Sequence, residues 1–127
     1  MIKNPSDNQE VFEFIVAHLL TQKEKSLDEK GIGYRYRGEN GLKCAVGAII
    51  PDEDYDLTWE GCALKSPLLL IKPSPIDSYL DNKGYDRDLL SDLQFIHDVF
   101  DVSSWKNNLK ISATRFNLSF PEYLVIS

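Results

Sequence analysis

The clearest pattern along the chain is the helical spacing of apolar side chains near the N-terminus. Between residues 9 and 25 they recur every three or four positions and form two adjacent stripes: Val11, Ile15 and Leu19, and Phe12, Val16 and Leu20. This spacing is typical of a helix with a wide buried face. Just before it stand three residues that suit the N-cap position, Ser6, Asp7 and Asn8. We therefore expect an N-terminal helix over about 9–25, with His18 at the edge of its apolar face.

The same spacing predicts two helices near the C-terminus. The helix over about 87–100 carries Leu89, Leu93, Ile96 and Phe100 on one stripe, with Asp86 or Asp88 as its cap. The helix over about 103–117 carries Trp105, Leu109, Ala113 and Phe116, with Ser103 as its cap. Asn117 suits the left-handed conformation that ends many helices. A shorter helix over about 75–82 is expected to end before Gly84.

The middle of the chain, 34–61, reads as a hairpin followed by an acidic segment. Residues 34–37 alternate aromatic and basic, as a half-exposed strand does, and the Asn-Gly pair at 40–41 is a strong turn signal. Residues 42–50 are compatible with a returning strand or with a short helix. We favour a brief pairing near Lys43 and then a buried helical turn. The apolar residues 64–71, interrupted by Pro67, are expected to form a connector packed on the core.

These elements predict an α+β fold of mainly α type, with about four helices and one short β-hairpin. A chain of 127 residues with 43% hydrophobic residues suits a single compact domain over 1–127. No apolar run approaches the roughly 20 residues of a membrane span, and the N-terminus lacks the pattern of a signal peptide. Two cysteines are too few for a disulfide framework. We expect a soluble cytoplasmic protein.

Acidic residues are concentrated in one part of the chain. The net charge is −6, and five acids but no base fall between residues 44 and 64. Direct binding to nucleic acid is disfavoured, because it needs clustered Lys and Arg. An acidic surface instead favours a basic partner. The candidate partner-binding residues are Asp52, Asp54, Asp56, Trp59 and Glu60.

The most distinctive run of the chain is YRGENGLKCAVGAIIPDEDYD, residues 36–56, with WEG at 59–61. It resembles a pattern that recurs in small uncharacterised proteins of phages and prophages. A second block, residues 93–98 with Trp105, Leu109 and Asn117, resembles their C-terminal half. The resemblance covers about residues 10–120 and implies a phage or mobile-element setting in a bacterium, without implying an activity. Asn117 stands where many of those sequences carry glycine, which is a compatible exchange at a helix end.

These observations favour a small acidic accessory protein that acts by binding a host or phage protein. One version is an inhibitor of a host defence or nucleic-acid-processing factor, and a sharper one is mimicry of DNA by the acidic face. The sequence shows no catalytic signature, so we lean away from an enzyme without excluding one. The oligomeric state is open, and the connector 64–71 is a possible interface.

The alternative is an enzyme or small-ligand module centred on Cys44 and His97, with Asp98 as the orienting carboxylate. A nucleophilic thiolate needs a base within hydrogen-bond reach and a group that orients that base. Cys44 lies inside an apolar run, however, where a thiol is usually buried and inert. The spacing along the chain does not establish that the three side chains meet.

Residues Tyr34, Arg35, Tyr36 and Arg37 are a possible ligand-binding strand. Aromatic rings interleaved with arginines can stack on bases or bind phosphate. They can equally form a hairpin strand whose arginines pair with the acids at 52–56, tying the two segments together. Both interpretations remain open at this point.

No metal or cofactor is expected. Cys44, Cys62, His18 and His97 match the number of ligands of a zinc site but not the spacing of any zinc motif. Asp52, Asp54 and Asp56 resemble the start of a calcium loop. Such a loop needs glycine at its sixth position and glutamate at its twelfth, where this chain has Leu57 and Ala63.

Overall fold

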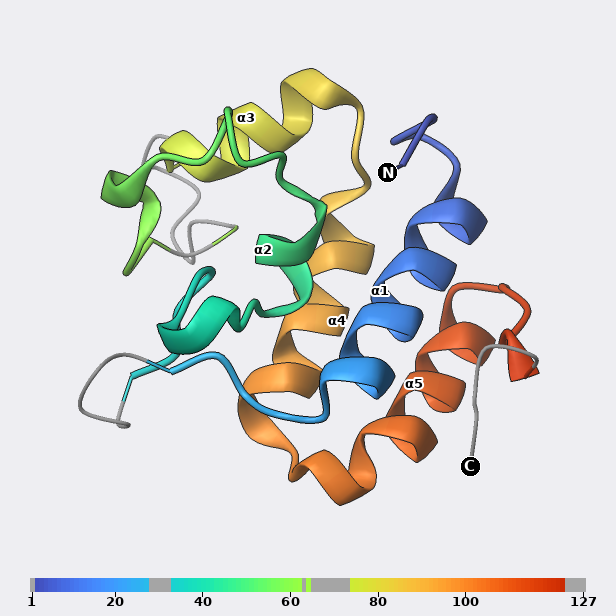
Figure 1. Cartoon of the computed structure of the whole chain (residues 1–127). Coiled ribbons are helices and arrows are strands. Elements are labelled where there is room, and N and C mark those ends of the chain that lie inside the picture. Colours follow the sequence, from blue (N-terminus) through green and yellow to red (C-terminus); the bar gives the residue numbers. More distant parts are fainter. Residues whose placement is uncertain (1, 28–32, 63, 65–73, 123–127) are drawn as a thin grey trace.

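Helices form nearly all the regular structure of this protein. The computed structural model describes residues 2–27, 33–62, 64 and 74–122 (Figure 1). The α-helices in these ranges are α1 (Asn8–Gln22), α2 (Ala45–Ile49), α3 (Pro75–Lys83), α4 (Arg87–Val99) and α5 (Val102–Arg115). Two short 3₁₀ helices, η1 (Glu39–Gly41) and η2 (Leu57–Trp59), lie in the segment between α1 and α3. The mainly α prediction is therefore confirmed.

Helix starts follow local capping signals, with one exception. The Asp7 side chain accepts hydrogen bonds from the amides of Gln9 and Glu10, and Asp86 caps α4 in the same way. The predicted cap Ser103 is wrong, because α5 already begins at Val102 with Asp101 at its N-cap. Phe100 ends α4 in an extended conformation, so a two-residue corner is enough to start the next helix.

Helices α1, α4 and α5 contact one another and lie side by side in Figure 1. The short helix α2 packs on α1 and α4, and all five of its residues are buried. A single hydrophobic cluster joins these helices, with fully buried Phe12 and Leu19 from α1 and Trp105 and Leu109 from α5. This continuous core confirms a compact single domain.

The predicted β-hairpin is wrong for the described residues, which contain no β-strand. The pairing there is limited to two isolated antiparallel bridges, Leu27 with Tyr34 and Arg37 with Lys43. The second bridge is the brief pairing expected near Lys43, and the buried helix α2 follows it. The strand cannot extend, because a carboxylate takes the place of a partner strand: Glu60 accepts the amides of Tyr36 and Arg37.

Most of the predicted connector 64–71 lies outside the described residues, which include only Leu64 from it; Leu64 is buried. The connector's part in packing or self-association therefore stays a prediction. None of the helices in the described part of the chain is both long and apolar enough to cross a membrane.

Candidate functional site

Two of the five candidate partner-binding residues are built into the fold. Trp59 is buried, with its ring centroid 4.9 Å from that of Tyr79 and 6.4 Å from that of Tyr55. Glu60 accepts the amide of Tyr36 at 2.9 Å and that of Arg37 at 3.1 Å, and it also accepts the Tyr55 hydroxyl. Both side chains hold the acidic segment against the core, which explains them without a partner.

The three aspartates of this segment are partnered within the protein but differ in exposure. Asp52 is exposed and pairs with Arg37 at 2.5 Å, while half-buried Asp54 accepts the Tyr79 hydroxyl at 2.5 Å. Asp56 is exposed and caps η2 through hydrogen bonds from Thr58. Those hydrogen bonds lower the pKa of Asp56 and favour its ionised form.

The outward side of this segment combines charge with an exposed apolar side chain. Leu57 is 65% exposed, directly after Asp56 and close in sequence to exposed Asp52 and Glu53. We name Asp52, Glu53, Asp56 and Leu57 the acidic face. Its members are exposed residues of the predicted partner-binding segment.

A separate pocket of about 600 Å³ lies against α4. One wall is a single helical face, because Gln94, Phe95 and Asp98 stand three, four and seven residues after Ser91. The opposite wall comes from residues 34–36 and from Gly61, Cys62 and Leu64. The pocket therefore contains three of the four residues predicted as a ligand-binding strand. It is hereafter called the α4 pocket.

The four predicted strand residues have different surroundings. Tyr34 is 45% exposed, whereas Tyr36 is buried and its hydroxyl donates to the carbonyl of Cys62. Arg35 lies 3.8 Å from the Glu60 carboxylate. Arg37 pairs with Asp52 and donates to the carbonyl of Ile50. The arginines therefore tie this segment to the acidic one, the structural interpretation left open above.

Asp98 reaches the α4 pocket as part of a hydrogen-bonded group. Nε2 of His97 accepts the Ser26 amide at 2.9 Å, so the ring proton is on Nδ1, which donates to Oδ1 of Asp98 at 2.7 Å. Nε2 of Gln94 donates to the same Oδ1 at 2.9 Å, and Oε1 of Gln94 accepts the Val46 amide. His97 itself is fully buried.

The geometry of Cys44 does not support a nucleophilic role. Its thiol is fully buried and accepts the Gly47 amide at the start of α2. Burial raises the pKa of Cys44 to about 12, so the thiolate is scarce at neutral pH. Both ring nitrogens of His97 are engaged, by Ser26 and by Asp98, which leaves neither to act as a base for Cys44. Of the three residues Cys44, His97 and Asp98, the structure joins His97 and Asp98 by a hydrogen bond, and Cys44 bonds to neither.

The two cysteines should differ sharply in alkylation. We expect iodoacetamide to modify the half-buried Cys62 in the native protein and to spare Cys44 until the chain is unfolded. Mass spectrometry of peptides at successive times, with and without denaturant, measures both rates in one sample. If native Cys44 reacted faster than Cys62, the buried and protonated state described here would be contradicted.

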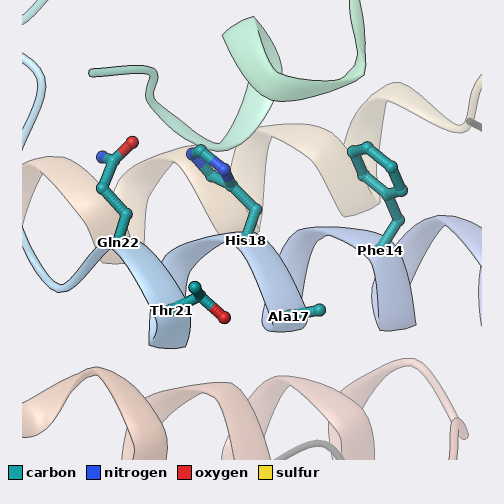
Figure 2. A pocket seen from close by; sticks show the side chains of 5 residues that line it. All are labelled: Phe14, Ala17, His18, Thr21 and Gln22. Carbon is teal, nitrogen blue, oxygen red and sulfur yellow. The ribbon is translucent and has the colours of Figure 1, made fainter. Parts of the chain in front are cut away.

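A second surface hollow, of about 420 Å³, runs along α1 beside His18 (Figure 2). Figure 2 shows His18 and Gln22 pointing from α1 toward the segment that precedes α2. Nε2 of His18 donates to the Lys43 carbonyl at 2.8 Å, and Gln22 bonds both the carbonyl and the amide of Lys43. Burial lowers the pKa of His18, which favours the neutral ring. These side chains satisfy backbone groups and fix the approach to α2.

The described residues contain no group of three or more His, Cys, Asp or Glu side chains placed to hold a metal ion. Two features of the α4 pocket escaped the sequence analysis, Gln94 and Phe95. Phe95 is 53% exposed although its neighbour Ile96 is buried, and an aromatic residue beside the apolar stripe was the available signal.

No family model, curated protein or solved structure matches this chain.

Proposed function

We propose that this is a small acidic accessory protein of phage type that acts by binding a host or phage protein. The observation that carries the proposal is Leu57, an apolar side chain 65% exposed within the acidic face. An exposed apolar side chain in an acidic segment suits a partner that combines a hydrophobic contact point with basic residues. A nucleic-acid-processing or defence factor in the bacterial cytoplasm offers such a basic surface.

The acidic face is held in shape before any partner arrives. Asp56 caps η2, and the amide of Asp54 donates to the carbonyl of Pro51. Asp52 is anchored by Arg37, and the whole segment is fastened by Glu60. A preordered surface loses less conformational entropy on binding, so a small contact area can still give a specific complex.

Affinity capture tests the proposal directly. Tagged protein is incubated with a nuclease-treated bacterial lysate, and stoichiometric partners are identified by mass spectrometry. A variant carrying Asp52→Asn, Asp56→Asn and Leu57→Ser should bind the recovered partner at least about tenfold more weakly, because it loses both charge and apolar contact. A variant carrying Asp101→Asn and Glu122→Gln removes the same charge from exposed positions elsewhere and should bind normally. Equal binding by all three proteins would contradict the acidic face as the contact.

A second candidate, binding of a small ligand, is favoured by the α4 pocket. The sequence analysis centred such a ligand-binding module on Cys44 and His97. In the structure Asp98 lines the pocket, and His97 does not line it but donates a hydrogen bond to the Asp98 carboxylate. This candidate is compatible with the first, because the pocket and the acidic face share no residue.

A further inference from the structure

We propose that the α4 pocket binds a primary ammonium group carried on an apolar stem, with Asp98 as counter-ion and Tyr34 and Phe95 as aromatic walls. This inference goes beyond the acidic face and does not depend on it. It rests on one carboxylate oxygen that accepts no hydrogen bond from the described residues, on the fixed orientation of that carboxylate and on the side chains around it.

The two oxygens of Asp98 have different surroundings. Oδ1 accepts two hydrogen bonds, from His97 at 2.7 Å and from Gln94 at 2.9 Å. Oδ2 accepts none from the part of the chain that the structure describes, and the side chain is 30% exposed at the pocket. A carboxylate that is fixed through one oxygen presents the other as an acceptor for a donor in the pocket.

The group behind Asp98 is rigid and mostly buried. The His97 ring is stacked on Trp105, with centroids 5.5 Å apart and planes 29° apart, and its far nitrogen is held by Ser26. Burying a polar ring is unfavourable unless its hydrogen bonds are made, and here both are made. The arrangement holds the Asp98 carboxylate in one orientation, which lowers the cost of binding a cation there.

Two exposed aromatic rings line the same pocket. Tyr34 is 45% exposed and Phe95 is 53% exposed. Nζ of Lys25 already lies 5.3 Å from the centroid of Tyr34, an internal example of a cation over this ring. Rings beside a carboxylate favour a positively charged group and also cover the hydrocarbon to which it is attached.

Two cationic side chains of the described residues lie near Asp98, and each contacts a group other than its carboxylate. Arg35 lines the pocket, but Glu60 lies 3.8 Å from it. Lys25 donates to the backbone carbonyl of Asp98 and makes no ion pair with its carboxylate among the described residues. No Lys or Arg of the described residues forms an ion pair with the Asp98 carboxylate, so it is available to a cationic group of a ligand.

The geometry selects the type of cation. A guanidinium group binds best through two parallel hydrogen bonds to both carboxylate oxygens, whereas an ammonium ion needs one. Because Oδ1 already serves two donors, Oδ2 suits an ammonium group. The pocket volume of about 600 Å³ is far larger than that group and lies within the usual range of ligand sites, which leaves room for a stem.

The ammonium group has two possible sources, a free amine or a lysine side chain of another protein, and the experiment separates them. Isotope-labelled protein is titrated with phenethylamine and with its uncharged counterpart phenethyl alcohol, followed by amide NMR shifts. A second pair of titrations uses a short lysine peptide and the same peptide acetylated on Nζ. Preference for the free amine or for the peptide identifies the source.

We expect saturable shifts at residues 91–98 and 34–36, with at least tenfold weaker binding of the uncharged member of each pair. Asp98→Asn keeps the size of the side chain and an oxygen for His97, and it should weaken ammonium binding at least tenfold. Phe95→Ala, at an exposed position, should weaken it about threefold and serves if Asp98→Asn fails to fold. Asp52→Asn should leave amine binding unchanged, so that this test and that of the acidic face can fail separately.

The inference would be overturned by equal binding of charged and uncharged probes, by wild-type affinity in the folded Asp98→Asn variant, or by shifts confined to residues outside the pocket. Absence of binding by both ammonium probes at millimolar concentration would do the same.

Discussion

Replacing Gly47 by Ala should destabilise the protein by about 3 kcal/mol or more, the upper end of the effect of overpacking. A methyl group at this position would stand 1.8 Å from the carbonyl oxygen of Tyr36 and 2.7 Å from its carbonyl carbon. Both are backbone atoms, so no side-chain rotation relieves the clash. The same carbonyl accepts the Cys44 amide, and separating the two segments would break that bond as well.

Thermal and urea unfolding of purified protein measure this loss. Ala48→Gly, at the next position of α2, removes a methyl group instead of adding one and should cost only about 1 kcal/mol. A Gly47→Ala protein as stable as the wild type would show that α2 and Tyr36 are not in contact. Loss of folded protein during expression would agree with the expected effect, provided that Ala48→Gly is recovered.

Glu60→Ala should lower the free energy of unfolding by about 2–4 kcal/mol. The carboxylate is mostly buried and accepts the Tyr36 amide, the Arg37 amide and the Tyr55 hydroxyl. Hydrogen bonds to a charged acceptor are worth about 1.5–3 kcal/mol each, and their loss is partly offset where water reaches the freed donors. Arg35 would also lose a neighbouring negative charge.

Glu53→Ala is the matched control, because Glu53 is an exposed acid of the same segment. It should change stability by no more than about 0.5 kcal/mol. Urea denaturation of both variants, at one pH and one salt concentration, gives the comparison. Equal stability of the two variants would make Glu60 an ordinary surface acid, and its place among the candidate partner-binding residues would regain weight.

Much of the helical framework was predictable because its causes are local. The apolar stripes of α1, α4 and α5 lie within the elements that they define, and the caps Asp7 and Asp86 stand a few residues from the amides that they bind. Asp101 was missed because Ser103, two residues later, is an equally suitable N-cap residue, and the sequence does not decide between them.

The hairpin and the pocket depend on contacts that sequence spacing does not contain. Glu60 lies 24 residues from Tyr36, yet its carboxylate replaces the strand that would have paired there. Ser26 lies 71 residues from His97, and their hydrogen bond decides which nitrogen faces Asp98. The types of residue for a reactive site were visible in the sequence, but the hydrogen bonds that occupy His97 were not.

The close approach of Gly47 to Tyr36 has a consequence for how such a protein can diverge. The distinctive segment 36–56 contains residues, such as Tyr36 and Gly47, that hold it to the rest of the protein. Preservation of this segment in another chain would therefore indicate a shared core and not a shared target. Glu53 and Leu57 are exposed and make none of these contacts, so they are free to vary without disturbing the core. Two chains with the same run could therefore have the same architecture and different binding specificities.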